Sequence, residues 1–517
     1  MSLIRYILEN PATPVEARQA ALDRIHRSPG LPTAKGSTEP FWLRDPHPTI
    51  SKLQSANLPK DADIAIIGSG ITGLSVAWKV LHTAKERGVN PPSIVMLEAR
   101  DACSGATGRN GGHLLETVLE YLDFKKAVGQ KAAIKLTRFR LGHLPEMDEL
   151  ARTRPEIRKD SQLRRVEFIS VYFDEESFKA AVHSLAEFKK DMPQESSAFA
   201  SHTGEKLTKE LGLSSYAVGA ITGPAGAVWP YRLVTHLLAE LQRTFAPSFR
   251  LETNTPVTGI EAAFLDACLD RPRPYRITTP RGVLRATHVV HCTNGHAGHL
   301  VPGLRGRVVP VRGQMSAQGA GARFANQASA RSWLINYHQG FDYLTQLPAA
   351  EAGTGSGGEM MLGGGLAAAR HGGLEEVGVA SDDAVDLYVD VHLSGALPVV
   401  FGRERWGQSE GVKCMWTGIM GFSADGFPWV GELAESLTGR RRDEAAGGAE
   451  WAAVGYSGEG MVHAWLSGKA VAILLLERQG IIPAAAVEEM HGWLPEQLRI
   501  TEERIERAVI SGAVASS

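Results

Sequence analysis

The sequence contains little cysteine, with four residues in 517: Cys103, Cys268, Cys292 and Cys414. They form no Cys-x-x-Cys pair, which argues against a disulfide framework and against a zinc site. The chain begins Met-Ser-Leu-Ile-Arg without the long apolar core of a secretory signal, and it does not end in Ser-Lys-Leu. We therefore expect a cytoplasmic protein.

The sequence also lacks long hydrophobic runs and an excess of charge of either sign. Its longest apolar run covers residues 470–476, whereas a membrane helix needs ~20 apolar residues. Lys and Arg number 55 and Asp and Glu number 57, so the net charge of −2 shows no basic excess of the kind that nucleic-acid binders carry. Hydrophobic residues make up 43%, as in ordinary globular proteins. We expect neither a membrane nor a nucleic-acid partner, and the oligomeric state stays open.

The sequence predicts that residues 1–59 form an arm ahead of the first domain. A helix is expected near 14–27, and prolines then recur from Pro29 to Pro59. Prolines at this density break helices and central strands. Because residues 41–43 read Phe-Trp-Leu, the arm has apolar side chains to bury, and we expect it to pack on the surface.

A glycine-rich turn follows the first apolar strand, which is expected at 63–67. A helix is expected at 74–87 and a second strand at 93–97, so the turn lies inside a βαβ unit. In that context G-x-G-x-x-G is a dinucleotide-binding fingerprint, in which the first glycine permits the tight turn, the second admits the pyrophosphate and the third lets helix and strand pack. The helix N-terminus supplies N–H groups to the phosphates. The six residues are Gly68, Ser69, Gly70, Ile71, Thr72 and Gly73.

Glu98 ends the second strand of this unit. A carboxylate at that position accepts hydrogen bonds from the adenosine ribose, and it repels a 2′-phosphate, which disfavours NADP. The fingerprint and the carboxylate fit FAD and NAD equally well.

The next segment, residues 103–113, reads Cys-Ser-Gly-Ala-Thr-Gly-Arg-Asn-Gly-Gly-His, a series of small residues that can wrap a large flat ligand. It resembles the loop along the pyrophosphate and isoalloxazine in FAD enzymes of the D-amino-acid-oxidase (DAO) superfamily. Over about residues 60–480, further segments resemble the same superfamily in the same order, at 256–260, 308–314, 425–431 and 455–461. Residues 107–112 resemble its amine-oxidising branch, near γ-glutamylputrescine oxidase and sarcosine oxidase.

The resemblance implies an α/β fold: a Rossmann-type FAD-binding domain and an α+β substrate domain built on a mixed or antiparallel sheet. We expect both domains to be discontinuous along the chain. The FAD-binding domain is expected at 60–118, 220–307 and 411–490, the substrate domain at 119–219 and 308–410, and a tail at 491–517.

The resemblance also implies the residues that bind FAD. Besides the fingerprint and Glu98 they are Ala99, Arg100, Ser104, Gly105, Ala106, Thr107, Arg109, Asn110, Gly111, Gly112, His113, Val257, Thr293, Asn294, Gly295, Cys414, Gly455, Tyr456, Ser457, Gly458, Glu459, Gly460 and Met461. Cys414-Met415-Trp416-Thr417 resembles the segment of sarcosine oxidase and fructosyl-amine oxidase whose cysteine is bonded to the flavin. A covalent link through Cys414 and a packed thiol are both open, and His113 is a weaker candidate for the link.

The resemblance implies an FAD-dependent oxidoreductase that oxidises an amine or amino acid to an imine by hydride transfer to flavin N5. Oxygen is the expected acceptor, giving hydrogen peroxide. Sarcosine oxidase has a lysine near N5, whereas residues 360–363 here read Met-Met-Leu-Gly, so Arg109, His113 or a bound cationic product would have to replace it. A dehydrogenase with another acceptor and a non-catalytic flavoprotein are the alternatives.

The catalytic candidates are Trp416, Tyr337, Tyr343 and Arg109, with the three aromatic residues expected to form an apolar wall beside the flavin. Since only Arg109 and Arg312 could bind a carboxylate, an amine is favoured over a free amino acid. No metal is expected, because an Asn-Gly turn separates His291 from the histidines that follow it.

Overall fold

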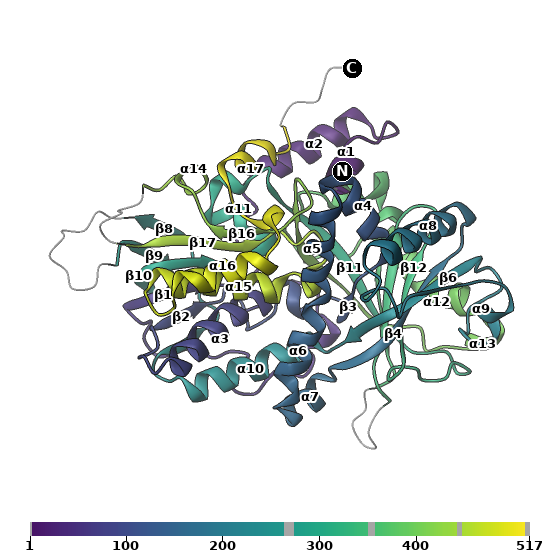
Figure 1. The fold of residues 1–517 in the computed structure, drawn as a ribbon, viewed down its shortest axis with the longest axis horizontal. Helices are drawn as coiled ribbons and strands as arrows, with labels where there is room; N and C mark the ends of the chain where they lie inside the picture. Colours follow the sequence, from purple (N-terminus) through teal and green to yellow (C-terminus); the bar gives the residue numbers. More distant parts are fainter. Residues whose placement is uncertain (1–2, 263–272, 350–356, 442–446, 512–517) are drawn as a thin grey trace.

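The computed structural model describes residues 3–262, 273–349, 357–441 and 447–511. These residues form two sheets that lie side by side, each with helices packed against it (Figure 1). The sheets meet near the middle of the molecule, and the segments that resemble an FAD-binding loop lie at their junction.

The first sheet is mostly parallel and contains the fingerprint strand. Its order is β16 (Trp429–Glu432), β17 (Ala449–Val454), β10 (Gly282–His291), β1 (Asp61–Ile67), β2 (Ile94–Leu97) and β7 (Phe249–Glu252). The pairs from β17 to β7 are parallel, whereas β16 is antiparallel to β17. Such buried parallel strands read as continuous apolar runs, which is why β1 and β2 could be predicted. An antiparallel hairpin joins this sheet through β10, formed by β8 (Gly259–Ala262) and β9 (Tyr275–Thr279).

Helices cover the first sheet closely. α3 (Ile71–Glu86) packs against α15 (Ala464–Arg478) and α10 (Pro230–Thr244). Gly468 of α15 lies so near α3 that a Cβ there would come within 2.7 Å of the carbonyl oxygen of Thr72. This contact fixes the start of α3, and with it the fingerprint turn.

The second sheet is mixed and mostly antiparallel. Its order is β15 (Val412–Ser423), β11 (Val308–Gln318), β14 (Met360–Gly364), β13 (Phe341–Gln346), β12 (Arg331–Asn336), β4 (Arg164–Tyr172), β6 (Gly219–Ala227) and β3 (His113–Leu115), with β5 (Ala200–His202) beside β6. One face packs against α4 (Val118–Val128), α5 (Gln130–Leu141) and α8 (Glu175–Asp191). The opposite face packs against α12 (Leu387–Phe401).

Three strands lie in a different sheet from the one that the expected domain boundaries gave them. β15, β6 and β3 were expected in the FAD-binding domain but belong to the second sheet. β15 pairs with β11 along nearly its whole length, from Val412 to Ser423. A strand's apolar pattern shows that it is buried and leaves its neighbour undetermined, so the sequence could not place these strands.

Two local details complete this part of the fold. Gly142 separates α5 from α6 (His143–Arg152). In the segment 256–260, β8 begins only at Gly259, which leaves Val257 in a loop.

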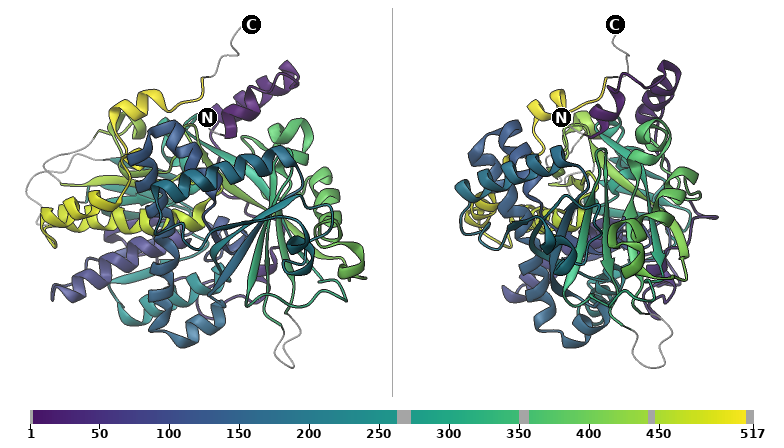
Figure 2. Two further views of the ribbon diagram at one scale, coloured as in Figure 1. Left: turned by 45° about the vertical axis from the view of Figure 1, so that its right-hand side comes forward. Right: turned by 90° about the vertical axis from the view of Figure 1, so that its right-hand side faces the viewer.

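The N-terminal arm packs on the surface, as expected. It contains α1 (Leu3–Leu8), α2 (Val15–His26) and a short 3-10 turn (Phe41–Leu43) in which Trp42 is fully buried. The indole N–H of Trp229 donates to the carbonyl oxygen of Trp42 (3.0 Å). α2 and α17 (Glu502–Arg507) lie on the same side of the molecule (Figures 1 and 2).

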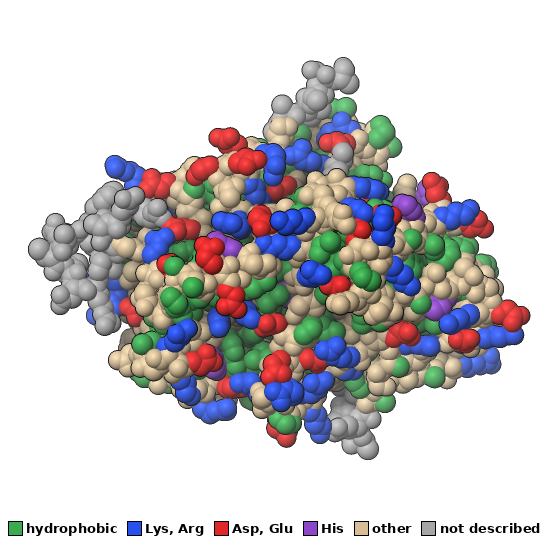
Figure 3. Space-filling view, in the orientation of Figure 1, with side chains coloured by type: hydrophobic (Ala, Val, Ile, Leu, Met, Phe, Trp, Pro, Cys, Tyr) green, Lys and Arg blue, Asp and Glu red, His purple; other side chains and the backbone are tan. Residues whose placement is uncertain are grey.

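The remaining helices are short or peripheral. They are α7 (Pro155–Ser161), α9 (Glu205–Lys209), α11 (Ala297–Leu300), α13 (Arg403–Trp406), α14 (Glu435–Thr438) and α16 (Ala484–Trp493). Within the described part of the chain, none of the helices has both the length and the apolarity to cross a bilayer. Acidic and basic side chains are interspersed over the face shown in Figure 3.

Candidate active site

A cavity lies between the two sheets, where β1, β2 and β10 end. Counting its open mouth, it holds about 1610 Å³. Ile67, Leu97 and Cys292 line it from the first sheet, and Met315 and Tyr343 line it from the second. Ligands of parallel sheets bind outside the carboxyl ends of the strands, so the cavity has the position of a cofactor site that a second layer closes.

The fingerprint turn accepts only glycine at two positions. Gly68 has a φ of +110°, and a Cβ there would lie 2.6 Å from the carbonyl oxygen of Cys292. A Cβ on Gly73 would lie 2.1 Å from the carbonyl oxygen of Gly68. Gly70 lines the cavity at the start of α3, and the next N–H, that of Ile71, donates to Thr107 Oγ1 (3.1 Å). The N-terminus of α3 therefore borders the cavity, where the positive end of the helix dipole suits an anion.

Glu98 is held at the cavity wall by its own neighbours. Its Oε2 accepts the backbone N–H of Ser69 (3.1 Å) and the Ser69 hydroxyl (2.7 Å), and its Oε1 accepts the N–H of Arg100 (3.0 Å). A carboxylate offers about four acceptor positions, so acceptor capacity remains for ribose hydroxyls.

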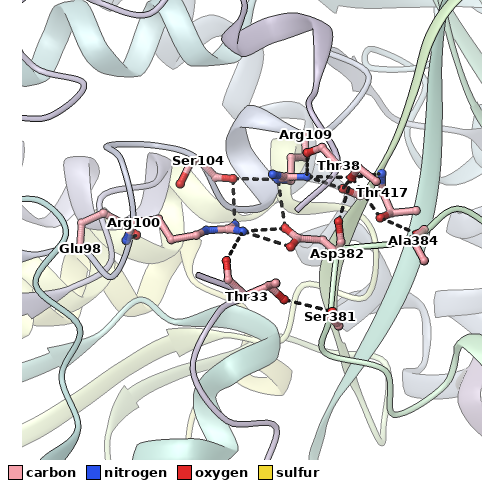
Figure 4. Close-up of polar contacts among 10 residues, drawn as sticks. All are labelled: Thr33, Thr38, Glu98, Arg100, Ser104, Arg109, Ser381, Asp382, Ala384 and Thr417. Atoms are coloured by element: carbon pink, nitrogen blue, oxygen red, sulfur yellow. Dashed lines mark hydrogen bonds and ion pairs between the residues drawn. The ribbon is translucent and has the colours of Figure 1, made fainter. Parts of the chain in front are cut away.

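A buried carboxylate joins two arginines beside this wall (Figure 4). Asp382 Oδ2 lies 2.9 Å from Arg100 Nη1 and 3.2 Å from Arg109 Nε, and both arginines also donate to the carbonyl oxygen of Ser104. Burial lowers the pKa of Arg109 to about 10, with Asp382 opposing the shift, so this arginine is cationic at neutral pH. Two cations share one carboxylate, and the positive charge that is left over suits an anionic pyrophosphate at the same wall. We call Arg100, Asp382 and Arg109 the clasp.

The N-terminal arm completes the cavity next to the clasp. Gly30, Leu31 and Pro32 line the cavity, and the N–H of Thr38 donates to the carbonyl oxygen of Asp382 (2.8 Å). The sequence analysis missed both the arm's part in the cavity and Asp382. No local motif marks either, because they reach the site only through tertiary packing.

Most of the expected FAD-binding residues come together around this cavity. Those that line it are Gly68, Gly70, Ile71, Thr72, Glu98, Ala99, Arg100, Gly105, Ala106, Thr107, Arg109, Asn110, Val257, Thr293, Asn294, Gly295, Tyr456, Gly458, Gly460 and Met461. Lining residues that the sequence analysis did not name include Ile67, Leu97, Cys292, His296, His299, Leu300, Gly313, Met315, Gly418, Ile419, Met420 and Ala464.

The other expected residues are not part of the lining. They are Ser69, Gly73, Ser104, Gly111, Gly112, His113, Cys414, Gly455, Ser457 and Glu459. Gly111 packs under the ring of Tyr343, where a Cβ would come within 2.6 Å. His113 Nε2 lies 2.8 Å from the hydroxyl of Ser332, within the second sheet.

Glu459 belongs to a buried charge cluster. Its carboxylate pairs with Arg140, which also pairs with Glu116 and Glu120. Burial raises the pKa of Glu459, but Arg140 outweighs this and holds it below its usual range, whereas burial raises the pKa of Glu116 to about 7. The cluster ties the turn at 455–461 to α5.

The four catalytic candidates differ in position. Tyr343 and Arg109 line the cavity. Trp416 is fully buried beside it, and its indole N–H donates to the carbonyl oxygen of Arg109 (2.9 Å). Tyr337 lies away from the cavity, since its hydroxyl donates to Asp342 (2.8 Å) on the opposite face of the sheet.

The histidines near Asn294 point to separate partners. His291 Nε2 lies 2.9 Å from Glu450, His296 Nδ1 lies 3.2 Å from the Gly30 carbonyl oxygen and His299 Nδ1 lies 3.1 Å from the Ser28 hydroxyl. Among the residues that the structure describes, no group of three or more His, Cys, Asp or Glu side chains is placed to hold a metal ion.

Residues 63–474 match the family model described as FAD dependent oxidoreductase (DAO). The match covers most of the chain, so the protein belongs to this family and is an FAD-dependent oxidoreductase. The arm lies ahead of the matched residues. A comparison with curated proteins found no match.

Solved structures share the fold at low sequence identity. Glycine oxidase from Geobacillus kaustophilus is 19% identical over 81% of this chain and 95% of its own, with a TM-score of 0.58. L-Proline dehydrogenase from P. horikoshii is 17% identical over 84% and 100%, with a TM-score of 0.56. L-Amino acid deaminase from Proteus vulgaris is 16% identical over 84% and 98%, with a TM-score of 0.56. The likeness confirms the expected fold class.

The residues around the cavity fit the family's cofactor. A glycine cradle and a helix N-terminus could hold the pyrophosphate, and Glu98 lies at the wall where it could accept hydrogen bonds from the ribose. Thr293 Oγ1, at the lining, is buried without a hydrogen-bond partner among the described residues. A buried hydroxyl of this kind is costly unless a ligand satisfies it.

Proposed function

We propose that this enzyme oxidises the C–N bond of a small amine to an imine, with oxygen as the acceptor. The observation that carries the proposal is that a single cavity joins the fingerprint turn to an apolar wall of Met315, Tyr343, Ile419 and Met420 from the second sheet. Bound FAD would supply the acceptor for the hydride that leaves the carbon next to nitrogen. The wall would orient the substrate's apolar part and exclude water.

Tyr343 and the carboxylates at the cavity support a substrate that enters as the neutral amine. Burial raises the pKa of Tyr343, and Asp342 raises it further, so its hydroxyl can donate a hydrogen bond but does not act as a base at neutral pH. The carboxylates that line the described wall, Glu98 and Asp382, are engaged by Ser69 and by the clasp arginines.

An amine fits better than a free amino acid. Arg312, one of the two arginines considered for a carboxylate, is bound by both oxygens of Glu376 (2.6 and 3.1 Å). Arg109, the other, is bound to Asp382 and to the carbonyl oxygens of Ser104, Thr38 and Thr417. With both guanidinium groups engaged, a substrate carboxylate would lack a dedicated partner.

Matched substrate pairs test this preference. Isopentylamine and leucine differ by a carboxylate on the same skeleton, and we expect kcat/KM for the amine to be at least about tenfold higher, which corresponds to about 1.4 kcal/mol. A preference for the amino acid would contradict the proposal. Peroxide release in air identifies an oxidase, whereas turnover only with an artificial acceptor identifies a dehydrogenase.

The position of Cys414 supports non-covalent FAD. Cys414 lies on β15, outside the cavity lining, whereas Gly418 on the same strand lines it. Acid precipitation should therefore release the flavin into the supernatant, and Cys414→Ala should leave that result unchanged. Flavin that stays with the precipitated protein, and that is released in Cys414→Ala, would show a covalent link.

A further inference from the structure

An apolar surface lies along α12. Among the described residues, 13 large hydrophobic side chains are exposed, and five of them lie on or just before this helix: Val385, Leu387, Tyr388, Val391 and Val399. Their exposed fractions run from 38% to 71%. Single exposed hydrophobic residues are ordinary, but a contiguous group marks an interaction surface. We call these five residues the α12 surface.

The sequence of α12 is that of a helix covered on both sides. Its inner residues Val389, Leu393 and Leu397 are packed in the core of the second sheet. Its outer side carries the α12 surface, and Asp390 is the sole Asp, Glu, Lys or Arg within the helix, where His392 pairs inward with Asp342 (2.8 Å). A surface helix normally has a charged outer face, and a helix that is hydrophobic all round is normally buried. The described chain covers only the inner side (Figure 2).

The chemistry of the surface disfavours a membrane. Helices that lie on a bilayer carry Lys and Arg on their polar face. α12 carries none, and Asp383, Asp386 and Asp390 lie at its start.

The position of the surface disfavours an electron acceptor. Asp342 and Leu344 of β13 face α12, while Tyr343 between them faces the cavity. The sheet therefore separates a partner on α12 from the site of oxidation. A second copy of this chain is the occupant that fits both observations.

We propose that two copies pair through the α12 surface, with the helices antiparallel and a two-fold axis at Gly395. Gly395 is exposed, and a Cβ built there meets nothing within 4 Å, so the two backbones can approach closely at this point. Val391 and Val399 lie one turn on either side of Gly395. Val391 of each copy would pack against Val399 of the other copy, as a two-fold interface requires.

The charges at the two ends of α12 complement each other in this arrangement. Asp383 and Asp390 lie just before and within the first turn of the helix, and Arg403 and Arg405, with Glu404 between them, follow its end, which gives that end a net charge of +1. An antiparallel pair sets the acidic end of each copy beside the basic end of the other. The helix dipoles are antiparallel too, so each end meets the opposite partial charge.

The mass of the FAD-loaded full chain in solution tests the proposal. Sedimentation equilibrium should give twice the 55.7 kDa of one chain. The double substitution Leu387→Lys with Val391→Lys should weaken the dimer at least tenfold, with the flavin spectrum retained as evidence of folding. Tyr216→Lys is the matched control, since Tyr216 and Leu387 are both 71% exposed, and it should leave the dimer intact.

A cysteine cross-link tests the register independently. Gly395→Cys should form a disulfide between copies on mild oxidation. Leu387→Cys should not, because the two cysteines would lie about 24 Å apart along the helix pair at 1.5 Å per residue. A monomeric wild type, a dimer that resists both lysines, or a cross-link at residue 387 alone would overturn the proposal. So would a monomer that sediments with phosphatidylglycerol vesicles, since the membrane would then be the occupant.

Discussion

Gly70 lies where the backbone must admit a pyrophosphate. A Cβ there would come within 2.9 Å of Thr107 Oγ1, a side-chain atom, so a larger residue fills the cavity wall more than it disturbs the fold. We expect Gly70→Val to abolish FAD binding while the chain remains folded, which absorbance and circular dichroism would show together. Gly259→Val, at a position where a Cβ meets nothing within 4 Å, should keep its flavin. Equal FAD content in the two variants would contradict this role.

Asp382 is the only carboxylate that pairs with the clasp arginines in the described structure. Its replacement by asparagine would leave two cations side by side, of which Arg109 is buried, and breaking a buried pair costs about 3–5 kcal/mol. We expect Asp382→Asn to lower the free energy of unfolding of the apoprotein by that amount in urea titrations. The neighbouring exposed Asp383→Asn should change it by less than about 0.5 kcal/mol. If both substitutions have the same small effect, the clasp does not stabilise the fold.

Among the elements, the contact between α6 and α15 should respond to acid. His143 is fully buried: it donates from Nδ1 to the carbonyl oxygen of Phe139 (3.0 Å) and accepts the N–H of Leu466 at Nε2 (3.2 Å). Burial lowers its pKa to about 4, whereas the pKa of a histidine in the unfolded chain is about 6.5. As the pH falls from about 6.5 to 4, His143 therefore lowers the free energy of unfolding by ~1.4 kcal/mol per pH unit.

The slope of unfolding free energy against pH isolates this histidine. His143→Gln should reduce the slope between pH 4 and 6.5 by the contribution of one proton, ~1.4 kcal/mol per pH unit. The variant should also be less stable overall. His183→Gln, at an exposed position on α8, should leave the slope as it is. A His143→Gln variant with the wild-type slope would show that His143 binds its proton equally in both states.

Elements whose local pattern is strong could be predicted from the sequence, and their partners could not. α2, β1, α3 and β2 lie close to the expected positions, because burial on one or both sides leaves a periodic apolar signal. The pairing of β15 with β11, by contrast, is a long-range contact that no local pattern marks. The fingerprint side of the cavity was predictable because its strands and helix carry a strong local pattern. Asp382 and residues 30–32 were not predictable, because only long-range contacts bring them to the cavity.

At the scale of the whole molecule, the second sheet brings Tyr343 into the cavity lining. Tyr343 lines the cavity and Tyr337 on the same hairpin does not, which makes them a matched pair. We expect Tyr343→Leu to lower kcat/KM about tenfold, a loss of about 1.4 kcal/mol in transition-state binding, with FAD still bound. Tyr337→Leu should affect stability more than kinetics, because its hydroxyl donates to Asp342. The reverse order of kinetic effects would place the substrate elsewhere.

Anaerobic mixing of the purified enzyme with a panel of amines tests the central claim most directly. The enzyme should be yellow, and the visible band of its oxidised flavin should disappear with at least one amine before any acceptor is added. A colourless protein that binds NAD, or a flavin band that persists with every amine and amino acid in the panel, would contradict the account.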